Sequence, residues 1–175
     1  MPFFLIRHLP TSWNSEGRLQ GRVDIPILPP DIKTIEDIRS TKKKLTGEVF
    51  DAILTSGLIR TKQTAELYGY HNYKVEPLVN ELDFGPFEGK PKSDLLEQDG
   101  GLWLSSPADI ALGETMKDFE KRLRVFIDKN RGRTLLVFSH GAVIRALKAI
   151  HEKGSITSMN TSFVKNNELV VLEDF

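Results

Sequence analysis

Phe3-Phe4-Leu5-Ile6-Arg7-His8 opens the chain with an unbroken apolar run followed by two basic residues. A short apolar run without alternation is typical of a strand that is buried on both faces. Residues 50–54 and 134–138 repeat this pattern, and the second of them is followed by Ser139-His140-Gly141. The chain therefore contains several predicted strands that end in polar or charged side chains.

Helical patterns separate these predicted strands. Apolar residues recur at helical spacing from Ile32 to Leu45, after the start signal Asp31, and again in residues 115–130. The other predicted elements are helices at 58–68 (ended by Gly69), near 92–97 and from 141 to near Gly154, a short strand at 73–75, and a terminal hairpin of 162–164 and 168–172 around Asn166-Asn167. Strands that alternate with helices predict a layered α/β fold with a largely parallel sheet. We expect a single domain over residues 1–175, with a long loop region at 85–113.

The composition excludes several classes of protein. With 39% hydrophobic and 27% charged residues, the chain is neither disordered nor collagen-like. The 24 basic and 24 acidic residues cancel, so no global field attracts nucleic acid or an anionic membrane, and any anion site must be local. Absence of cysteine excludes disulfides and thiolate sites. Because the first apolar run is too short for a signal peptide or a membrane span, we expect a cytoplasmic protein.

Basic and imidazole side chains gather just beyond the predicted strand ends. Arg7 and His8 follow the first strand, Arg60 lies shortly after the second, and His140 follows residues 134–138. In open α/β folds, ligands bind outside the carboxyl ends of the strands. We therefore expect these four side chains to face one ligand site.

Two interpretations compete with a catalytic role for the histidines. A lone histidine is more often structural than catalytic, and this explanation suffices for His71 and for His151, which lies at a predicted helix end. His8, His140 and Glu81 could alternatively form a metal site with two histidines and one carboxylate. The neighbouring guanidiniums argue against it, because arginine stays protonated and repels a divalent cation.

A third interpretation, a phosphate-binding pocket, gives every residue of the cluster a role. Guanidinium groups match phosphate oxygens in bidentate geometry, and an imidazole lone pair is a competent nucleophile toward phosphorus. Phosphoryl transfer needs positioning and neutralised oxygens, which arginine and histidine supply without a metal. It also needs a proton for the departing alkoxide. Glu81, just before the glycine-rich run of residues 83–89, is the candidate general acid.

Four stretches carry a family pattern. They are residues 7–26, which begin Arg7-His8-Leu9-Pro10-Thr11, residues 56–66 around Arg60, residues 80–89 with Asn80-Glu81, and Ser139-His140-Gly141. In this order, across nearly the whole chain, they closely resemble the histidine phosphatase superfamily, the phosphoglycerate mutase-like proteins. The family fold is a three-layer sandwich with a mostly parallel mixed sheet between helices, which agrees with the pattern above.

The resemblance also implies a role for each site residue. His8 would be the nucleophile that becomes a phosphohistidine, and Glu81 would be the proton donor and later the base. The groups that would bind the phosphoryl group and substrate are Arg7, Asn14, Gln20, Gly21, Arg60 and His140. The family's phosphatases imply no cofactor and no metal.

Leu9 departs from the family pattern, which usually has a glycine after the nucleophile. The following Pro10 pushes Leu9 toward extended geometry, so Leu9 cannot easily copy a glycine with positive φ. We therefore expect a narrower and more apolar pocket beside His8.

These observations predict a metal-independent phosphomonoester hydrolase. A phosphoglycerate-type mutase is one alternative, but it would need a second anion site and a longer insertion than the 59 positions from Glu81 to His140. The nearby candidates for that site are Lys90 and Lys92. The second alternative is a phospho-ligand binding module without turnover, although binding alone requires neither a nucleophile nor an acid.

The substrate is expected to be a small phosphorylated metabolite. Residues 91–113, in the long loop region, should select its leaving group. Nucleic acid and membranes are not expected partners. We expect a monomer or a homodimer.

Overall fold

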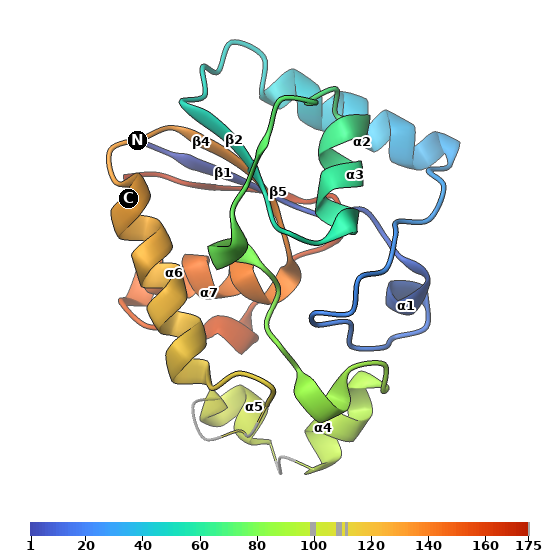
Figure 1. Cartoon of the computed structure of the whole chain (residues 1–175), viewed down its shortest axis with the longest axis vertical. Helices are drawn as coiled ribbons and strands as arrows, with labels where there is room; N and C mark the ends of the chain where they lie inside the picture. Colours follow the sequence, from blue (N-terminus) through green and yellow to red (C-terminus); the bar gives the residue numbers. More distant parts are fainter. Residues whose placement is uncertain (99–100, 108–109, 111, 175) are drawn as a thin grey trace.

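The computed structural model describes residues 1–98, 101–107, 110 and 112–174. Its strands and α-helices are β1 (Phe3–Arg7), α1 (Ser12–Ser15), α2 (Ile32–Lys44), β2 (Ala52–Thr55), α3 (Ile59–Leu67), β3 (Lys74–Val75), α4 (Lys92–Gln98), α5 (Leu102–Ser105), α6 (Met116–Asn130), β4 (Leu135–Ser139), α7 (Gly141–Lys153) and β5 (Leu169–Leu172). Short 3-10 helices lie at Pro77–Val79, Gly85–Phe87 and Met159–Thr161. Figure 1 shows the sheet between helical layers, with both termini on the same side.

The sheet has the strand order β3-β2-β4-β1-β5. β1 pairs with β4, β4 with β2 and β2 with β3 in parallel, whereas β5 runs antiparallel to β1. In the β1–β4 register Phe3 lies opposite Leu135 and Arg7 opposite Ser139. The carboxyl ends of the two central strands therefore meet at one edge, as the sequence predicts for a mostly parallel mixed sheet.

The two faces of the sheet pack against different helices because successive strand residues point to opposite faces. The face toward α6 and α7 presents Phe3, Leu5, Leu135 and Val137. The face toward α2 and α3 presents Phe4, Ile6, Leu136 and Phe138. Figure 1 shows the same division, with α2 and α3 on one side of the sheet and α6 and α7 on the other. These layers confirm the predicted α/β sandwich.

Local capping explains where the longer helices begin and end. The Asp31 side chain accepts the Thr34 N–H at 2.7 Å before α2, and the Thr115 hydroxyl accepts the Asp118 N–H at 3.0 Å before α6. α7 ends at Lys153 and is capped by Gly154, whose φ of 76° is left-handed. These helices agree with the periodicity in the sequence, although the first apolar position of α2, Ile32, is 81% exposed.

Several local predictions were wrong. Residues 162–164 form no strand, so the terminal hairpin is absent; Asn166-Asn167 is a turn, but β5 pairs with β1 instead. The predicted strand at 50–54 begins two residues later, at Ala52. The loop region contains α4 as predicted and also α5, which the sequence pattern did not indicate.

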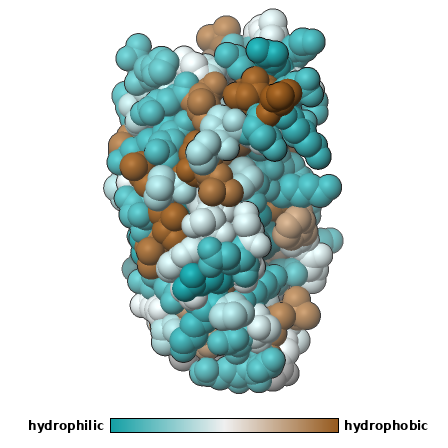
Figure 2. All heavy atoms as spheres, turned by 90° about the vertical axis from the view of Figure 1, so that its right-hand side faces the viewer, coloured by the Kyte–Doolittle hydropathy of each residue, from teal (hydrophilic) through white to brown (hydrophobic). Residues whose placement is uncertain are grey.

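The face of the molecule that Figure 2 presents is mainly hydrophilic. Figure 2 shows scattered brown groups among teal and white residues on the face that it presents. Among the described residues, no helix is long and apolar enough to cross a membrane.

Candidate active site

The two histidines of the predicted cluster lie side by side at the carboxyl edge of the sheet. His8 follows β1 and His140 follows β4, and the His8 N–H donates to the Ser139 carbonyl at 2.9 Å. The centroids of the two imidazole rings are 5.3 Å apart. Parallel pairing of the central strands therefore brings together residues that are more than 130 positions apart in the chain.

His8 is held as a neutral imidazole with one defined free nitrogen. Its Nδ1 lies 2.7 Å from the Leu9 carbonyl oxygen. A carbonyl can only accept, so Nδ1 carries the hydrogen and Nε2 keeps its lone pair. Burial lowers the pKa of His8 well below its usual value, and the charges of Arg60 and Arg7 lower it further. Nε2 of His8 is therefore available as a nucleophile at neutral and mildly acidic pH.

Two arginines flank His8 with part of each guanidinium unpaired. Arg7 donates from Nη1 to the Val164 carbonyl at 2.6 Å, and its buried Nε has no hydrogen-bond partner among the described residues. Arg60 is fully buried and donates to the carbonyls of Val23 and Gly21 at 2.9 and 2.7 Å, while its Nε is likewise unpaired. Burial lowers the pKa of Arg60 to about 10, so the group remains charged near neutral pH.

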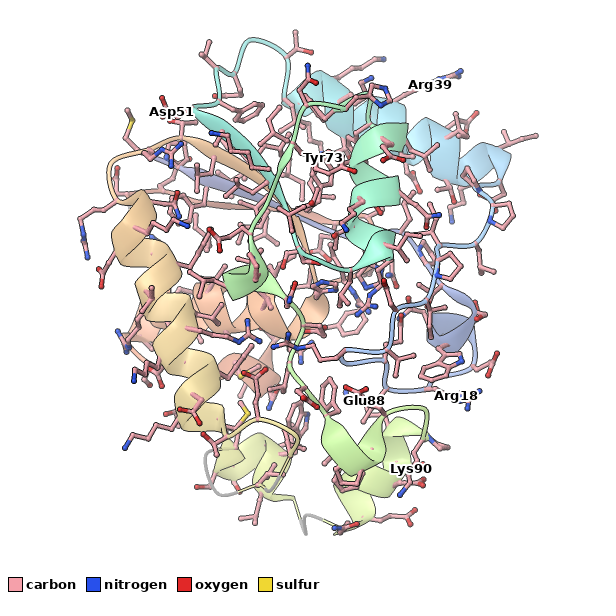
Figure 3. All side chains as sticks on the ribbon, in the orientation of Figure 1. Arg18, Arg39, Asp51, Tyr73, Glu88 and Lys90 are labelled. Carbon is pink, nitrogen blue, oxygen red and sulfur yellow. The ribbon has the colours of Figure 1, made fainter. Side chains whose placement is uncertain are left out.

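A tight turn brings the loop after α1 to Arg60. Gly21 has a φ of 54°, and a Cβ there would collide with the Glu88 carboxylate. Glu88 Oε1 accepts the Arg22 N–H at 2.7 Å, which holds the turn in place. Neighbouring Gln20 is buried, and its Oε1 has no partner among the described residues. Figure 3 shows Glu88 close to Arg18 and Lys90, where this loop runs beside the segment leading into α4.

The Glu81 carboxylate reaches the cavity from the loop after the 3-10 helix Pro77–Val79. It is 8% exposed, its Oε1 accepts the Leu82 N–H at 2.9 Å, and its Oε2 accepts the Ala142 N–H at 3.4 Å. The second bond comes from the first turn of α7, directly after His140. Two separate chain segments therefore fix the position of this carboxylate.

An arginine–glutamate pair supports the loop that carries Glu81. Arg122 donates to both carboxylate oxygens of Glu114, at 2.9 and 2.7 Å, and to the Glu81 carbonyl at 3.2 Å. Glu114 also accepts the Asp83 N–H at 3.0 Å. Burial acts to raise the pKa of Glu114, but the hydrogen bonds and charge of Arg122 lower it below its usual value. This pair is a positioning device that the sequence reasoning missed.

His140 is fully buried beside His8. Its Nε2 lies 2.8 Å from the Ser56 hydroxyl oxygen, and its Nδ1 has no partner among the described residues. Burial lowers the pKa of His140 well below its usual value, with Arg60 and His8 adding to the effect. Unlike His8, His140 does not line the cavity described next, so its predicted contact with the phosphoryl group stays a prediction.

A cavity of about 210 Å³ joins the predicted groups. The predicted site residues on its wall are Arg7, His8, Asn14, Gln20, Gly21, Arg60 and Glu81. Asn14 Oδ1 accepts from Thr11 N and Oγ1, at 3.1 and 3.2 Å, and from Asn166 Nδ2 at 3.3 Å. Its amide nitrogen is therefore the group left to donate toward a ligand.

The predicted effect of Leu9 on the pocket was wrong. Leu9 is 1% exposed and packs with Ile6 and Ile38 in the core on the α2 and α3 side, and it does not line the cavity beside His8. Its N–H donates to the Thr64 hydroxyl at 3.0 Å, and its φ is not positive. Leu9 therefore packs in the core in its extended geometry and does not shape the cavity beside His8.

The metal alternative is not supported by the arrangement of potential ligands. In the part of the chain that the structure describes, no group of three histidine or carboxylate side chains is placed to hold a metal ion. His71 and His151 are both exposed and away from the cavity. A neutral imidazole beside partly unpaired guanidiniums is instead an arrangement whose chemistry suits a phosphoryl group.

The comparison with known proteins agrees with this class of site. The Histidine phosphatase superfamily (branch 1) model matches residues 3–174. The chain belongs to the histidine phosphatase superfamily.

Relatives in this family carry different activities in their names. Over 156 residues the chain is 30% identical to 2-carboxy-D-arabinitol-1-phosphatase of Triticum aestivum, an alignment that covers 83% of this chain but only 31% of that protein. It is also 30% identical over 156 residues to the probable phosphoglycerate mutase GpmB of Cronobacter sakazakii, covering 82% of this chain and 71% of that one. This chain thus spans less than a third of the wheat relative's length.

A solved structure, of open reading frame Rv3214 from Mycobacterium tuberculosis, superimposes with a TM-score of 0.84. It is 22% identical, and the match covers 97% of this chain and 89% of that one. At this identity the similarity establishes the fold.

Proposed function

We propose that the chain is a metal-independent phosphomonoester hydrolase that acts on a small phosphorylated metabolite through a phosphohistidine on His8. The observation that carries the proposal is the free Nε2 of a buried, neutral His8 beside the unpaired Nε atoms of Arg7 and Arg60. A nucleophile next to unpaired cationic donors suits a phosphoryl group, whose oxygens would satisfy those donors.

In the first step, the Nε2 lone pair forms a bond to phosphorus while the ester P–O bond breaks. The electron pair of that bond goes to the ester oxygen, which takes a proton from the Glu81 carboxyl group. Arg7 and Arg60 neutralise the charge on the equatorial oxygens. The products of this step are an alcohol and a phosphorylated His8.

In the second step, water attacks the phosphorus of the phosphohistidine. Glu81, now a carboxylate, accepts a proton from that water, and the P–N bond breaks with its electron pair returning to Nε2. Inorganic phosphate leaves, and both His8 and Glu81 regain their starting protonation states. The two hydrogen bonds to Glu81 from Leu82 and Ala142 keep its carboxyl group in one position for both proton transfers.

The test compares the chain with its His8→Ala variant on p-nitrophenyl phosphate, with and without a chelator. We expect activity that survives the chelator and falls at least about a thousand-fold in His8→Ala, because the nucleophile is lost. His71→Ala, at an exposed histidine, is the matched control. A rapid quench with radiolabelled substrate should trap an acid-labile, alkali-stable phosphoprotein in the parent chain.

Other outcomes would support the alternatives. Activity lost to the chelator would favour a metal enzyme, and conversion of 3-phosphoglycerate to 2-phosphoglycerate would favour a mutase, as one relative's name does. Tight binding of inorganic phosphate by a folded chain that forms no phosphoprotein would favour a binding module.

A further inference from the structure

The turn before β5 lies against the carboxyl end of β1, although it has no role in the two steps above. Residues 165–168 form this turn, and the backbone N–H of Lys165 donates to the Glu168 carboxylate at 2.6 Å. The Arg7 N–H donates to the Glu168 carbonyl at 3.1 Å, and the Asn167 N–H donates to the Arg7 carbonyl at 3.0 Å. Backbone bonds therefore fix the turn directly beside His8, the proposed nucleophile.

Asn167 ties the same turn to α3. Its φ of 63° is left-handed, a conformation that asparagine adopts more readily than most residues. Its Oδ1 accepts the hydroxyl of Tyr68 at 2.6 Å. Tyr68 is 1% exposed and caps the C-terminus of α3. The neighbouring Asn166 therefore extends from a backbone that both the sheet and a helix hold in place.

The side-chain amide of Asn166 contacts the site from this backbone. Its Nδ2 donates to the His8 carbonyl oxygen at 2.9 Å and to Asn14 Oδ1 at 3.3 Å. Both partners are acceptors, because a carbonyl can only accept and Asn14 Oδ1 already accepts the Thr11 N–H. The two N–H groups of the amide are enough for both bonds. Within the described residues, Asn166 is the one hydrogen-bond donor to the His8 carbonyl.

The peptide group between His8 and Leu9 is thereby held at both ends. Asn166 binds its carbonyl oxygen, and the Thr64 hydroxyl of α3 accepts its N–H at 3.0 Å. The same hydroxyl donates to the Arg60 carbonyl at 2.6 Å, so it is itself fixed. Because a peptide group is planar, bonds to both its polar atoms prevent it from rotating.

The orientation of this peptide group affects where the His8 ring points. Nδ1 of His8 is held by the Leu9 carbonyl at 2.7 Å, and the position of that carbonyl follows from the peptide group before it. Nε2 lies on the other side of the ring, so the bond at Nδ1 sets the direction of its lone pair. Attack on phosphorus needs close alignment, and a misplacement of about 1 Å can cost about 100-fold in rate.

We propose that Asn166 is a positioning residue for phosphoryl transfer, whose amide holds the His8–Leu9 peptide group so that His8 Nε2 stays directed at the phosphorus. This inference rests on the proposed function through His8. Asn166 does not line the cavity, so it acts through the backbone of His8. Asn14 keeps its bonds from Thr11 N and Oγ1 without Asn166, so phosphate binding should depend little on it.

The experiment compares two substitutions of Asn166 at neutral pH. In Asn166→Ala, the single-turnover rate of His8 phosphorylation by p-nitrophenyl phosphate should fall about ten-fold or more, because the peptide group is released. The dissociation constant of inorganic phosphate should stay within about three-fold of the parent value. Asn166→Asp keeps the size of the side chain but replaces the donor by an acceptor, so its rate should fall at least as far.

Two matched controls separate the amide from its surroundings. Lys165→Ala changes an exposed neighbour in the same turn, and Asn72→Ala removes an exposed asparagine far from the cavity. Both should keep the phosphorylation rate of the parent chain, since surface substitutions away from specific contacts have small effects. Asn166→Asp preserves the size of the side chain, so it provides the test if Asn166→Ala does not fold.

Three results would overturn the positioning role. They are an unchanged phosphorylation rate in the Asn166 variants, a loss in Asn166→Ala that Asn166→Asp does not show, and a loss of phosphate affinity as large as the loss of rate. The second result would mean that the side chain only fills space. The third would mean that Asn166 acts through Asn14 on phosphate binding.

A measurement without turnover separates this inference from the proposed function. NMR of the chain with isotope-labelled histidine reports how fast the His8 Nδ1 hydrogen exchanges with water. Exchange should be about ten-fold or more faster in Asn166→Ala than in Lys165→Ala, because the bond to the Leu9 carbonyl is weakened. If this is found in a chain without phosphatase activity, the hydrolase proposal fails and the positioning role stands. Turnover through His8 with equal exchange in the two variants would reject the positioning role alone.

Discussion

The two sides of the cavity are built in different ways. The floor, formed by Arg7, His8, Arg60 and Glu81, lies near the carboxyl ends of the strands. The cover, formed by α4, α5 and residues 159–163, contributes Lys92, Trp103 and Phe163 to the cavity wall. α4 and α5 lie farther from the sheet than the strand ends do (Figure 1). Backbone bonds hold the floor, such as His8 N–H to the Ser139 carbonyl and Asn167 N–H to the Arg7 carbonyl at 3.0 Å.

In the cover, a side-chain bond from Asn160 to the Trp103 carbonyl joins two segments that are far apart in the chain. Strand-end backbone has little freedom, so it suits groups whose positions decide the rate of chemistry. Surface segments tolerate change, so they suit groups that select the leaving group. Changes to the floor should therefore act on every substrate, and changes to the cover should act on selectivity.

The largest effect is expected from Glu81→Gln on an alkyl phosphate. Loss of the proton donor should lower kcat by about 100- to 10,000-fold, because an alkoxide is a poor leaving group. On p-nitrophenyl phosphate, whose leaving group needs no proton, the loss in the phosphorylation step should be much smaller. Single-turnover measurements on both substrates test this difference.

Glu48→Gln, at an exposed position far from the cavity, is the control for that experiment. Equal losses on the two substrates in single turnover would mean that Glu81 positions the site rather than donating a proton. The floor would then contain a different acid.

A smaller effect is expected on stability at mildly acidic pH. Burial keeps His8 and His140 neutral in the folded chain, with pKa values well below the usual value. In the unfolded chain they take up protons near pH 6.5. The unfolding free energy should therefore fall as the pH drops below about 6.5, by up to about 1.4 kcal/mol per pH unit for each histidine.

Urea unfolding at pH 7 and pH 5.5 measures this slope. His140→Gln should reduce it, and His71→Gln, at an exposed site, serves as the control. The same slope in the parent chain and in His140→Gln would contradict the buried neutral state of His140.

The smallest effect is expected at the mouth of the cover. Phe163 is 69% exposed and lines the cavity, so Phe163→Ala should leave the unfolding free energy within about 0.5 kcal/mol. KM should rise about three-fold through lost apolar contact, with kcat little changed. Val49→Ala, at an 84% exposed position, is the control. A loss in kcat without a change in KM would mean that Phe163 affects the chemical step, as the floor residues do, rather than substrate binding.

Local sequence patterns were sufficient for most of the fold. Apolar runs predicted β1 and β4, and the start signal Asp31 predicted where α2 begins. Because a strand end is defined by its own residues, Arg7, His8 and His140 could be assigned to one edge of the sheet. The prediction of a terminal hairpin was wrong because residues 169–172 pair with β1 instead. No local sequence pattern shows that β1 has an edge open for this pairing.

Arg145, which lines the cavity from α7, is a residue whose surroundings local sequence patterns could not predict. Its position five residues after His140 was visible in the sequence, but a helix can present that position to the core, to solvent or to the cavity. The choice depends on how α7 lies against the strand ends. Leu9 is a similar case, since its neighbour in the chain, His8, faces the cavity while Leu9 itself enters the core.

The sequence by itself determined the strands, most of the helices and the types of residue at the strand ends, because these depend on interactions between near neighbours in the chain. The tertiary structure alone decided which side chains share the cavity and which atoms stay unpaired. Those outcomes depend on contacts across the sheet and between helices, such as Arg122 with Glu114 and Asn160 with Arg145. Long-range packing supplies that information.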